Sequence, residues 1–220
     1  SHLIKSVINS EISDETLPGI FNIIDNELGK GDVDLVIGGP PCQAYSVAGR
    51  ARKNMENDPR NHLYKHYVEF LKRYQPKMFV FENVPGILSA NNGIYLQLIF
   101  DAVREAGYKL EKQVLNAQDF GVLQDRKRVI IIGWKNNLEL EYPQFDKTEN
   151  KFEVLKHLFS DLPKIKSGQG EWRVSNYTKA TNAYLENSGI RNGLNFTTQH
   201  VARFHNDNDL EIYSIAVDKW

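Results

Sequence analysis

Apolar residues recur with two different spacings along the first 135 positions of the chain. Spacing of three or four residues predicts amphipathic helices at 17–28, 62–74 and 95–106. Short continuous apolar runs predict strands at 34–37, 78–81 and 129–134, and the last of these runs is typical of a strand covered on both faces. Strands that alternate with helices of about a dozen residues indicate βαβ units on a mostly parallel sheet. The pattern therefore predicts an open, doubly wound α/β fold.

The pattern changes after about residue 140. A polar stretch containing Pro143 comes first, and a helix is expected over 151–163. Residues 164–200 are rich in Gly, Ser, Asn and Thr without a clear period, which is typical of loops. A last helical run is expected over 207–220. We therefore expect one domain over residues 1–140 and the start of a small irregular second domain over 141–220.

Composition narrows the class of protein. The 220 residues are 41% hydrophobic with a net charge of -1, which indicates a real core and excludes a wholly basic nucleic-acid coat. No apolar run approaches the roughly 20 residues of a membrane helix, and the first residues, SHLIKSV, do not contain the apolar stretch of a signal peptide. A single cysteine cannot form an internal disulfide or a Cys-rich zinc site, and no metal is expected. These features predict a cytoplasmic protein.

Reactive side chains fall next to the predicted strands. Ligands of open α/β sheets bind at the carboxyl ends of the strands, so residues just beyond each strand are candidates. Cys42 follows strand 34–37 across Gly-Gly-Pro-Pro, a stiff turn that presents a thiol as nucleophilic catalysis requires. Glu82 directly follows strand 78–81. A third cluster enters the last predicted strand and contains Gln124, Arg126 and Arg128.

Each of these candidates also has a plain structural interpretation. Cys42 is also compatible with a small buried hydrophobe, although the stiff turn before it makes this less expected, and Glu82 is compatible with a surface carboxylate or a loop cap. Arg126 and Arg128 alternate on an extended segment, so they share one face and could form an exposed basic edge. The basic stretch 43–60 could be a solvated loop.

Together the three places resemble a known family. GGPPCQAYSVAGR (38–50), FENVPG (81–86) and QDRKRVIIIGW (124–134) resemble, in order and spacing, the signature motifs of the DNA (cytosine-5)-methyltransferases. DPRNHLY (58–64) is similar to the segment that closes the family's mobile catalytic loop. The resemblance is looser through DLP (161–163) to HVARFHNDNDLEIY (200–213).

The resemblance implies a Rossmann-like sheet, incomplete here, that uses S-adenosylmethionine to methylate C5 of a cytosine in double-stranded DNA. The target base is flipped out of the duplex, because the stack hides C5 and C6. By position, the Cys42 thiolate adds to C6, Glu82 donates to N3, and Arg126 contacts O2 with support from Arg128. The enzyme would be a restriction–modification or solitary methylase, acting in the cytoplasm near the nucleoid of a prokaryotic cell.

The same resemblance implies further contacts. The residues matched to DNA or base binding are Pro41, Gln43, Ser46, Arg60, Asn83, Gln124 and Arg128. Small and basic residues make the stretch from Gln43 to Arg60 suitable for a loop that closes on DNA. Glu11 stands where the family usually has an aspartate near the cofactor adenine, and Pro41 is a second candidate for contact with S-adenosylmethionine.

Several family motifs are not found in these 220 residues. They are the glycine-rich S-adenosylmethionine motif, the acidic residue that holds the cofactor ribose, and the motifs that close the domain from its C-terminal side. We therefore expect the chain to correspond to the central part of a methyltransferase catalytic domain, with residues 141–220 as connection and partial target-recognition region. Strand 34–37 would then have an unpaired edge. A complementary chain or segment that carries the cofactor motifs is an expected partner, beside double-stranded DNA.

Two other functions remain open from the sequence. A thiol hydrolase would use Cys42 with a histidine that activates it, but no histidine lies in a comparable presenting motif. A methyltransferase-like module that binds DNA without turnover is the second alternative, although Cys42, Glu82, Arg126 and Arg128 are all intact. Covalent trapping on DNA containing 5-fluorocytosine separates the methyltransferase from both.

Overall fold

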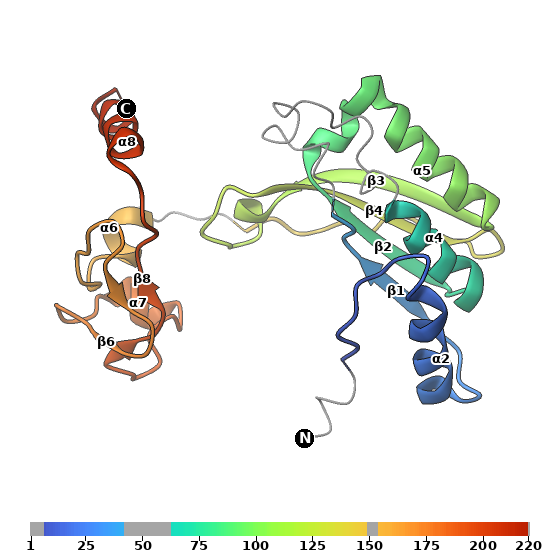
Figure 1. Ribbon diagram of the computed structural model, residues 1–220, viewed down its shortest axis with the longest axis horizontal. Coiled ribbons are helices and arrows are strands. Elements are labelled where there is room, and N and C mark those ends of the chain that lie inside the picture. Colours follow the sequence, from blue (N-terminus) through green and yellow to red (C-terminus); the bar gives the residue numbers. More distant parts are fainter. Residues whose placement is uncertain (1–6, 42–62, 149–153, 220) are drawn as a thin grey trace. The chain divides into compact units, whose positions relative to one another are not determined.

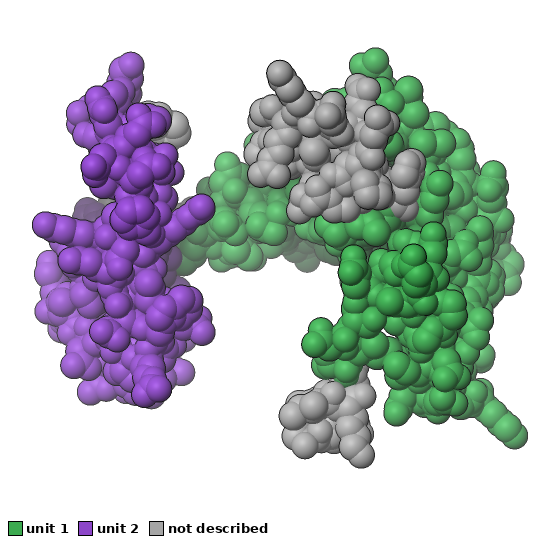
Figure 2. Space-filling model, viewed as in Figure 1, with its two compact units in different colours: residues 1–150 green, residues 151–220 purple. Residues whose placement is uncertain are grey.

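A computed structural model describes residues 7–41, 63–148 and 154–219 of the chain. The molecule divides into two compact units, residues 1–150 and residues 151–220 (Figures 1 and 2). The first unit contains the expected alternation of strands and helices, whereas the second contains short ribbons and helices.

The first unit contains every helix and strand that the apolar spacing predicts for it. Its helices are α2 (Leu17–Leu28), α4 (Leu63–Tyr74) and α5 (Ile94–Glu105), and its 3-10 helices are η4 (Pro85–Leu88), η5 (Ala90–Gly93) and η6 (Ala117–Asp119). Its strands are β1 (Leu35–Gly38), β2 (Met78–Asn83), β3 (Tyr108–Asn116) and β4 (Lys127–Lys135). Strand β2 continues to Asn83, so Glu82 lies within its last residues rather than beyond it.

The α/β class is confirmed, but the described sheet is mixed rather than mostly parallel. Its strand order is β1-β2-β4-β3, with β1 parallel to β2 and β4 antiparallel to both of its neighbours. The pattern of continuous apolar runs missed β3, because only half of this strand's side chains are shielded. Tyr108 is buried while its neighbour Lys109 is exposed, so the strand alternates instead of forming an apolar run.

Strand β4 runs antiparallel to β2, so residues at the start of β4 lie at the same edge of the sheet as residues at the carboxyl end of β2. Glu82 pairs with Ile130 and Asn83 pairs with Val129. The start of β4 therefore lies beside the carboxyl end of β2. Arg128, which precedes Val129, is placed at the edge where β1 and β2 also end.

One face of the sheet carries the main core. Phe79 and Phe81 of β2 pack with buried side chains of α4 and α5, the two helices that lie along the sheet in Figure 1. Gly133 of β4 makes room for this packing, because a Cβ there would lie 2.1 Å from the Phe79 ring. The aromatic contacts continue to Tyr108 of β3, whose ring lies 5.5 Å from that of Phe79 in an edge-to-face arrangement.

The other face is covered only in part by described residues. Trp134 and Ile132 pack with Tyr142, whose hydroxyl donates to the carbonyl of Ile130 at 3.1 Å. Toward β1 this cover ends, and Leu35 and Ile37 are 46% and 69% exposed. Among the described strands β1 is an edge strand, as the sequence predicts.

The boundary between the two units lies later in the chain than the expected residue 140. The polar pattern changes at about residue 140, but residues 138–148 contact the first unit. Thr148 donates its backbone N–H to the carbonyl of Asp119 at 2.7 Å. The compact units consequently separate after Asn150.

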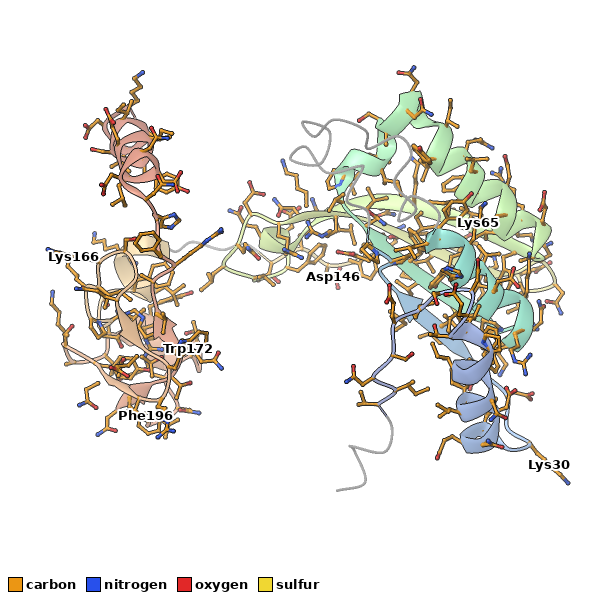
Figure 3. The ribbon with its side chains drawn as sticks, viewed as in Figure 1. Lys30, Lys65, Asp146, Lys166, Trp172 and Phe196 are labelled. Atoms are coloured by element: carbon orange, nitrogen blue, oxygen red, sulfur yellow. The ribbon has the colours of Figure 1, made fainter. Side chains whose placement is uncertain are left out.

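The second unit is irregular, as its composition predicts. Its elements are α6 (Val154–Leu158), β5 (Gly170–Glu171), β6 (Ser175–Asn176), α7 (Ala183–Asn187), β7 (Phe196–Thr197), β8 (His200–Val201) and α8 (Asp207–Asp218). The expected helix 151–163 ends early, at Leu158, and the expected helix 207–220 is present as α8. Trp172 is 69% exposed and projects from its ribbon (Figure 3). None of the helices in the described ranges has the length and apolar character needed to cross a membrane.

A buried ion pair fixes the centre of this unit. Asp161, only 1% exposed, accepts from Nε and Nη2 of Arg191 at 2.9 and 2.8 Å. The Arg191 guanidinium also lies 4.3 Å from the centre of the Tyr177 ring. This geometry joins three segments that lie far apart in the sequence.

Candidate active site

Gly38, the last residue of β1, and Gly39, which follows it, are each required by a different neighbour. A Cβ at Gly38 would lie 2.6 Å from the ring of Tyr67, and a Cβ at Gly39 would lie 3.0 Å from Oε2 of Glu82. Two neighbours therefore lie close to the end of β1: Tyr67 of α4 lies against Gly38, and the Glu82 side chain lies against Gly39. Both contacts hold the segment that leads to Cys42 close to β2.

Tyr67 also joins the two parallel strands directly. Its hydroxyl donates toward the carbonyls of Val80 at 2.9 Å and Val36 at 3.2 Å. Burial of the ring raises the pKa of this phenol above its usual value, so the hydroxyl stays a donor. The sequence suggested only a core position for Tyr67, and nothing in the apolar period signals its second role.

Asn83 connects the two motif loops. It is 3% exposed, and its Nδ2 donates to the carbonyl of Pro40 at 3.3 Å while its Oδ1 accepts from the N–H of Val84 at 2.8 Å. The structure thus places this side chain against backbone, where it fixes Pro40 and, through Pro41, the start of the segment carrying Cys42. Direct contact of Asn83 with DNA, which the resemblance implies, stays a prediction.

Glu82 and Arg128 form the charged pair of the site. The Arg128 Nε lies 2.6 Å from Oε1 of Glu82, with 22% of the arginine side chain and 40% of the glutamate side chain exposed. The Nε–H bond does not point at an acceptor, so the contact is an ion pair rather than an aligned hydrogen bond. The Nη1 group of Arg128 donates to the carbonyl of Lys127 at 2.8 Å. Among the described residues it is Arg128 that contacts Glu82.

Gln124 and Arg126 lie in the loop between η6 and β4, and both are exposed. The backbone of Arg126 is fixed on both sides: its N–H donates to Oδ1 of Asn116 at 3.0 Å, and its carbonyl accepts from Ala117 at 3.0 Å. These contacts leave the Arg126 side chain at the surface, near the carboxyl edge but outside the Glu82–Arg128 pair.

A cavity of about 540 Å³ lies beside the end of β1. The polar side chains in its wall belong to Glu11, His66 and Tyr67, and the remaining wall is apolar or backbone, from Ile12, Val36, Ile37, Gly38, Gly39, Pro40, Pro41, Leu63 and Phe70. Asp14 stands next to His66, with 3.6 Å between Oδ1 and Nδ1. The structure thus brings Glu11 and Pro41, the two expected cofactor residues, to one cavity.

Four predicted site residues lie outside the described ranges: Cys42, Gln43, Ser46 and Arg60. Their roles stay predictions. The described residue Pro41 precedes Cys42 directly, so the chain enters this segment at the site formed by Pro40, Asn83 and Glu82.

Comparison with known proteins identifies the family of the chain. A sequence model of the C-5 cytosine-specific DNA methylase family matches residues 7–220. The chain is 38% identical over 204 residues to the type II methyltransferase M.Bpa9945I of Bacillus paralicheniformis, covering 84% of this chain and 46% of that protein. It is 39% identical over 189 residues to the type II methyltransferase M.DdeI of Desulfomicrobium norvegicum, covering 82% and 44%. The chain thus spans about half the length of these relatives.

The fold has a match among solved structures. A DNA modification methyltransferase encoded within an E. coli prophage superimposes with a TM-score of 0.61 at 23% identity, covering 94% of this chain and 61% of that one. This likeness supports the Rossmann-like sheet. The family match over residues 7–220 shows that the chain belongs to the C-5 cytosine-specific DNA methylase family.

Proposed function

We propose that this chain carries the catalytic residues of a restriction–modification-type DNA methyltransferase that methylates C5 of cytosine through a covalent adduct with Cys42. The single observation that carries the proposal is the Glu82–Arg128 ion pair, whose carboxylate lies against Gly39, three residues before Cys42. A thiol, a carboxyl group and a guanidinium are the groups that this reaction needs at one place.

Cys42 supplies the nucleophile. C5 of cytosine is too poor in electrons to take a methyl group unaided. Addition of the thiolate to C6 saturates the C5–C6 bond and makes C5 enamine-like. After methylation, the C5 proton is lost and the thiolate is eliminated from C6, which restores the aromatic ring.

Glu82 and Arg128 match the edge of the base. N3 and O2 are neighbouring acceptors on cytosine, and a carboxyl group beside a guanidinium offers two neighbouring donors once the carboxyl is protonated. Arg128 is the arginine that contacts Glu82, with 2.6 Å between Nε and Oε1, so its guanidinium lies beside the carboxyl group that would meet N3. We therefore assign the O2 contact to Arg128 rather than to Arg126, and the N3 contact to Glu82.

The cavity beside β1 suits S-adenosylmethionine. Its volume of about 540 Å³ lies in the usual range for small-molecule pockets, and its apolar wall with one carboxylate suits a purine with an amino group. Glu11, Ile12 and Leu63 would hold the adenosine part. When bound, S-adenosylmethionine would supply an electrophilic methyl group on its sulfonium sulfur. Pro40 and Pro41 line the same cavity and precede Cys42, so the cofactor and the nucleophile would meet at this loop.

DNA would approach from the same edge of the sheet. Because C5 and C6 are stacked inside a duplex, the target cytosine must be flipped into the site. The exposed side chains of Gln124 and Arg126 would contact the DNA around the flipped base. Gln43, Ser46 and Arg60 belong to the segment that would close over it.

A further strand beside β1 would complete the sheet next to the cavity proposed for S-adenosylmethionine. The exposed edge of β1 and the exposed Leu35 and Ile37 form a surface on which another strand with apolar cover would fit. We propose that the segment carrying the glycine-rich cofactor motif binds there. Calorimetry of S-adenosylmethionine binding, with and without that segment, tests this; micromolar binding without it would contradict the assignment.

Substitution of Glu82 by Gln tests the chemical role. Gln still donates a hydrogen bond at N3 but cannot supply a proton, so kcat should fall far more than the affinity for DNA. Arg128→Lys and Arg126→Lys make a matched pair in the active methyltransferase. Arg128→Lys should lower kcat, because Lys cannot reproduce the planar donor, whereas Arg126→Lys should mainly raise KM for DNA.

A Glu82→Gln variant whose only defect is a higher KM would contradict the proton-donor role. Equal effects of the two arginine substitutions on kcat would contradict the assignment of Arg128 to the base.

A further inference from the structure

The loop that carries Gln124 and Arg126 is organised by one side chain at its base. Oδ1 of Asn116 accepts from the N–H of Gln118 at 3.3 Å and from the N–H of Arg126 at 3.0 Å. Its Nδ2 donates to Oδ1 of Asp125 at 2.8 Å. Asn116 is the last residue of β3, so one half-buried amide joins both ends of the loop between β3 and β4.

These bonds act on the peptide of Arg126 rather than on its guanidinium. The N–H of Arg126 is held by Asn116, and its carbonyl is held by Ala117, which extends the β3–β4 ladder by one pair. Both backbone groups of an exposed residue are therefore fixed. The direction in which the Arg126 side chain leaves the loop is set by Asn116 without contact between the two side chains.

The opposite side of the loop is supported separately. Asp119 pairs with Lys147 at 2.9 Å, and its carbonyl accepts from Thr148 at 2.7 Å. The Phe120 ring packs edge to face against Phe145 at 6.1 Å. These contacts hold η6 and the tip of the loop but do not reach Arg126, which makes Asp119 a suitable control.

We propose that Asn116 is a positioning residue for DNA binding, which acts by fixing the peptide of Arg126 and the carboxylate of Asp125 so that the Arg126 guanidinium meets the DNA. This inference rests on the proposed function, because it assigns Arg126 to the DNA. The ligand contacted is a phosphate of the substrate duplex, since the side chain is exposed and lies outside the Glu82–Arg128 pair.

Loss of the amide should weaken DNA binding without changing the chemical step. A contact that is made equally before and during the reaction changes KM and leaves kcat alone. We expect Asn116→Ala to raise KM for DNA about tenfold, as for the loss of one positioned contact. The dependence of binding on salt should also become less steep by about one phosphate contact.

Exchange of the two partners tests the geometry itself. Asn116→Asp still accepts from Gln118 and Arg126 but places two carboxylates at hydrogen-bond distance, so it should be as defective as Asn116→Ala. Asp125→Asn alone keeps an acceptor for Nδ2 and should be mild. The double variant Asn116→Asp with Asp125→Asn restores a donor and an acceptor in reversed order, and should recover KM to within about twofold of wild type.

The experiment measures KM and kcat on duplex DNA for these variants in the active methyltransferase, with Asp119→Asn as the matched control. Amide hydrogen exchange of Arg126, followed by NMR, measures how well Asn116 protects the N–H of Arg126, independently of any activity. Faster exchange at Arg126 together with a raised KM in Asn116→Ala, and recovery of both in the double variant, supports the proposal. Faster exchange with unchanged KM, or failure of the double variant to recover, overturns it. If the Glu82 and Arg128 variants had normal kcat, the proposed function would fail, whereas the exchange result would still stand.

Discussion

The two units of this molecule are stabilised in different ways. In the first unit, α4 and α5 cover one face of the sheet with a large cluster of buried apolar and aromatic side chains. In the described part of the second unit, the buried side chains are Tyr184, Leu185 and the charged Asp161. The first unit is therefore organised by the hydrophobic effect and the second by directional polar contacts around one ion pair.

This difference decides how each unit responds to substitution. A packed apolar core loses stability in proportion to the volume or shape that changes, and many neighbours share the loss. A unit that depends on one buried ion pair fails when either charge loses its partner. Three substitutions test this difference between the units, and their expected effects on stability decrease in size.

The largest effect is expected at Asp161. Replacing it with Ala leaves the Arg191 guanidinium, whose side chain is 14% exposed, without its counter-charge, and should cost about 3–5 kcal/mol in the second unit. Residue-level hydrogen exchange should show loss of protection in residues 154–219 with the protection of β2 and β4 unchanged. Replacement of both residues by apolar side chains should recover much of the loss. Equal loss of protection in both units would show that they do not fold separately.

A smaller effect is expected from Gly38→Ala. The new Cβ would lie 2.6 Å from the Tyr67 ring, which is held between α4 and two strand carbonyls, so the overpacking should cost about 1–3 kcal/mol. Gly19→Ala in α2 is the matched control, because nothing lies within 4 Å of its Cβ position. Urea unfolding of both variants measures the difference. If Gly38→Ala is as stable as Gly19→Ala, the Tyr67 contact does not constrain the end of β1.

The smallest effect is expected at the surface pair of Asp25 and Arg73, which joins α2 to α4. The hydrogen bond from Arg73 lowers the pKa of the Asp25 carboxyl below its ordinary value of 3.8. A lowered pKa in the folded state means that the pair stabilises the protein above pH 3.8 and that this contribution disappears as the pH falls through the folded-state pKa. The difference in unfolding midpoint between wild type and Asp25→Asn should therefore be small at pH 7 and vanish once the pH falls below the folded-state pKa of Asp25. A difference that grows on acidification would contradict the pairing.

The same contrast explains what the sequence could predict. Strong apolar spacing located α2, α4, α5, β1, β2 and β4, because the residues that face the core also define the period. Strand β3 was missed because about half of its side chains face solvent, so it has no continuous apolar run. The alternation of Tyr108 and Leu110 with charged residues was the pattern that could have predicted it. Residues 164–200 have no apolar period, so the pairing of Arg191 with Asp161 could not be predicted from spacing.

The candidate site was only partly predictable for a related reason. Short motifs identified Glu82, Arg126 and Arg128 as candidates, because such residue types are rare beside buried strands. Their pairing depends on the antiparallel direction of β4, which the sequence did not reveal. The same holds for the bonds of Asn83 to Pro40 and of Asn116 to Arg126, which connect residues 43 and 10 positions apart.

Covalent trapping tests the central claim, that Cys42 attacks C6 of a cytosine held by Glu82 and Arg128. In the normal reaction the C5 proton is lost after methyl transfer, and this loss releases Cys42. A fluorine at C5 cannot be lost in this way, so the thioether to Cys42 should persist on duplex DNA that contains 5-fluorocytosine. The active methyltransferase should give an adduct that survives denaturation and maps to Cys42, and Cys42→Ala should give none while it still binds S-adenosylmethionine. An adduct on Cys42→Ala, or methylation by that variant within about tenfold of wild type (about 1.4 kcal/mol in the barrier), would contradict the account.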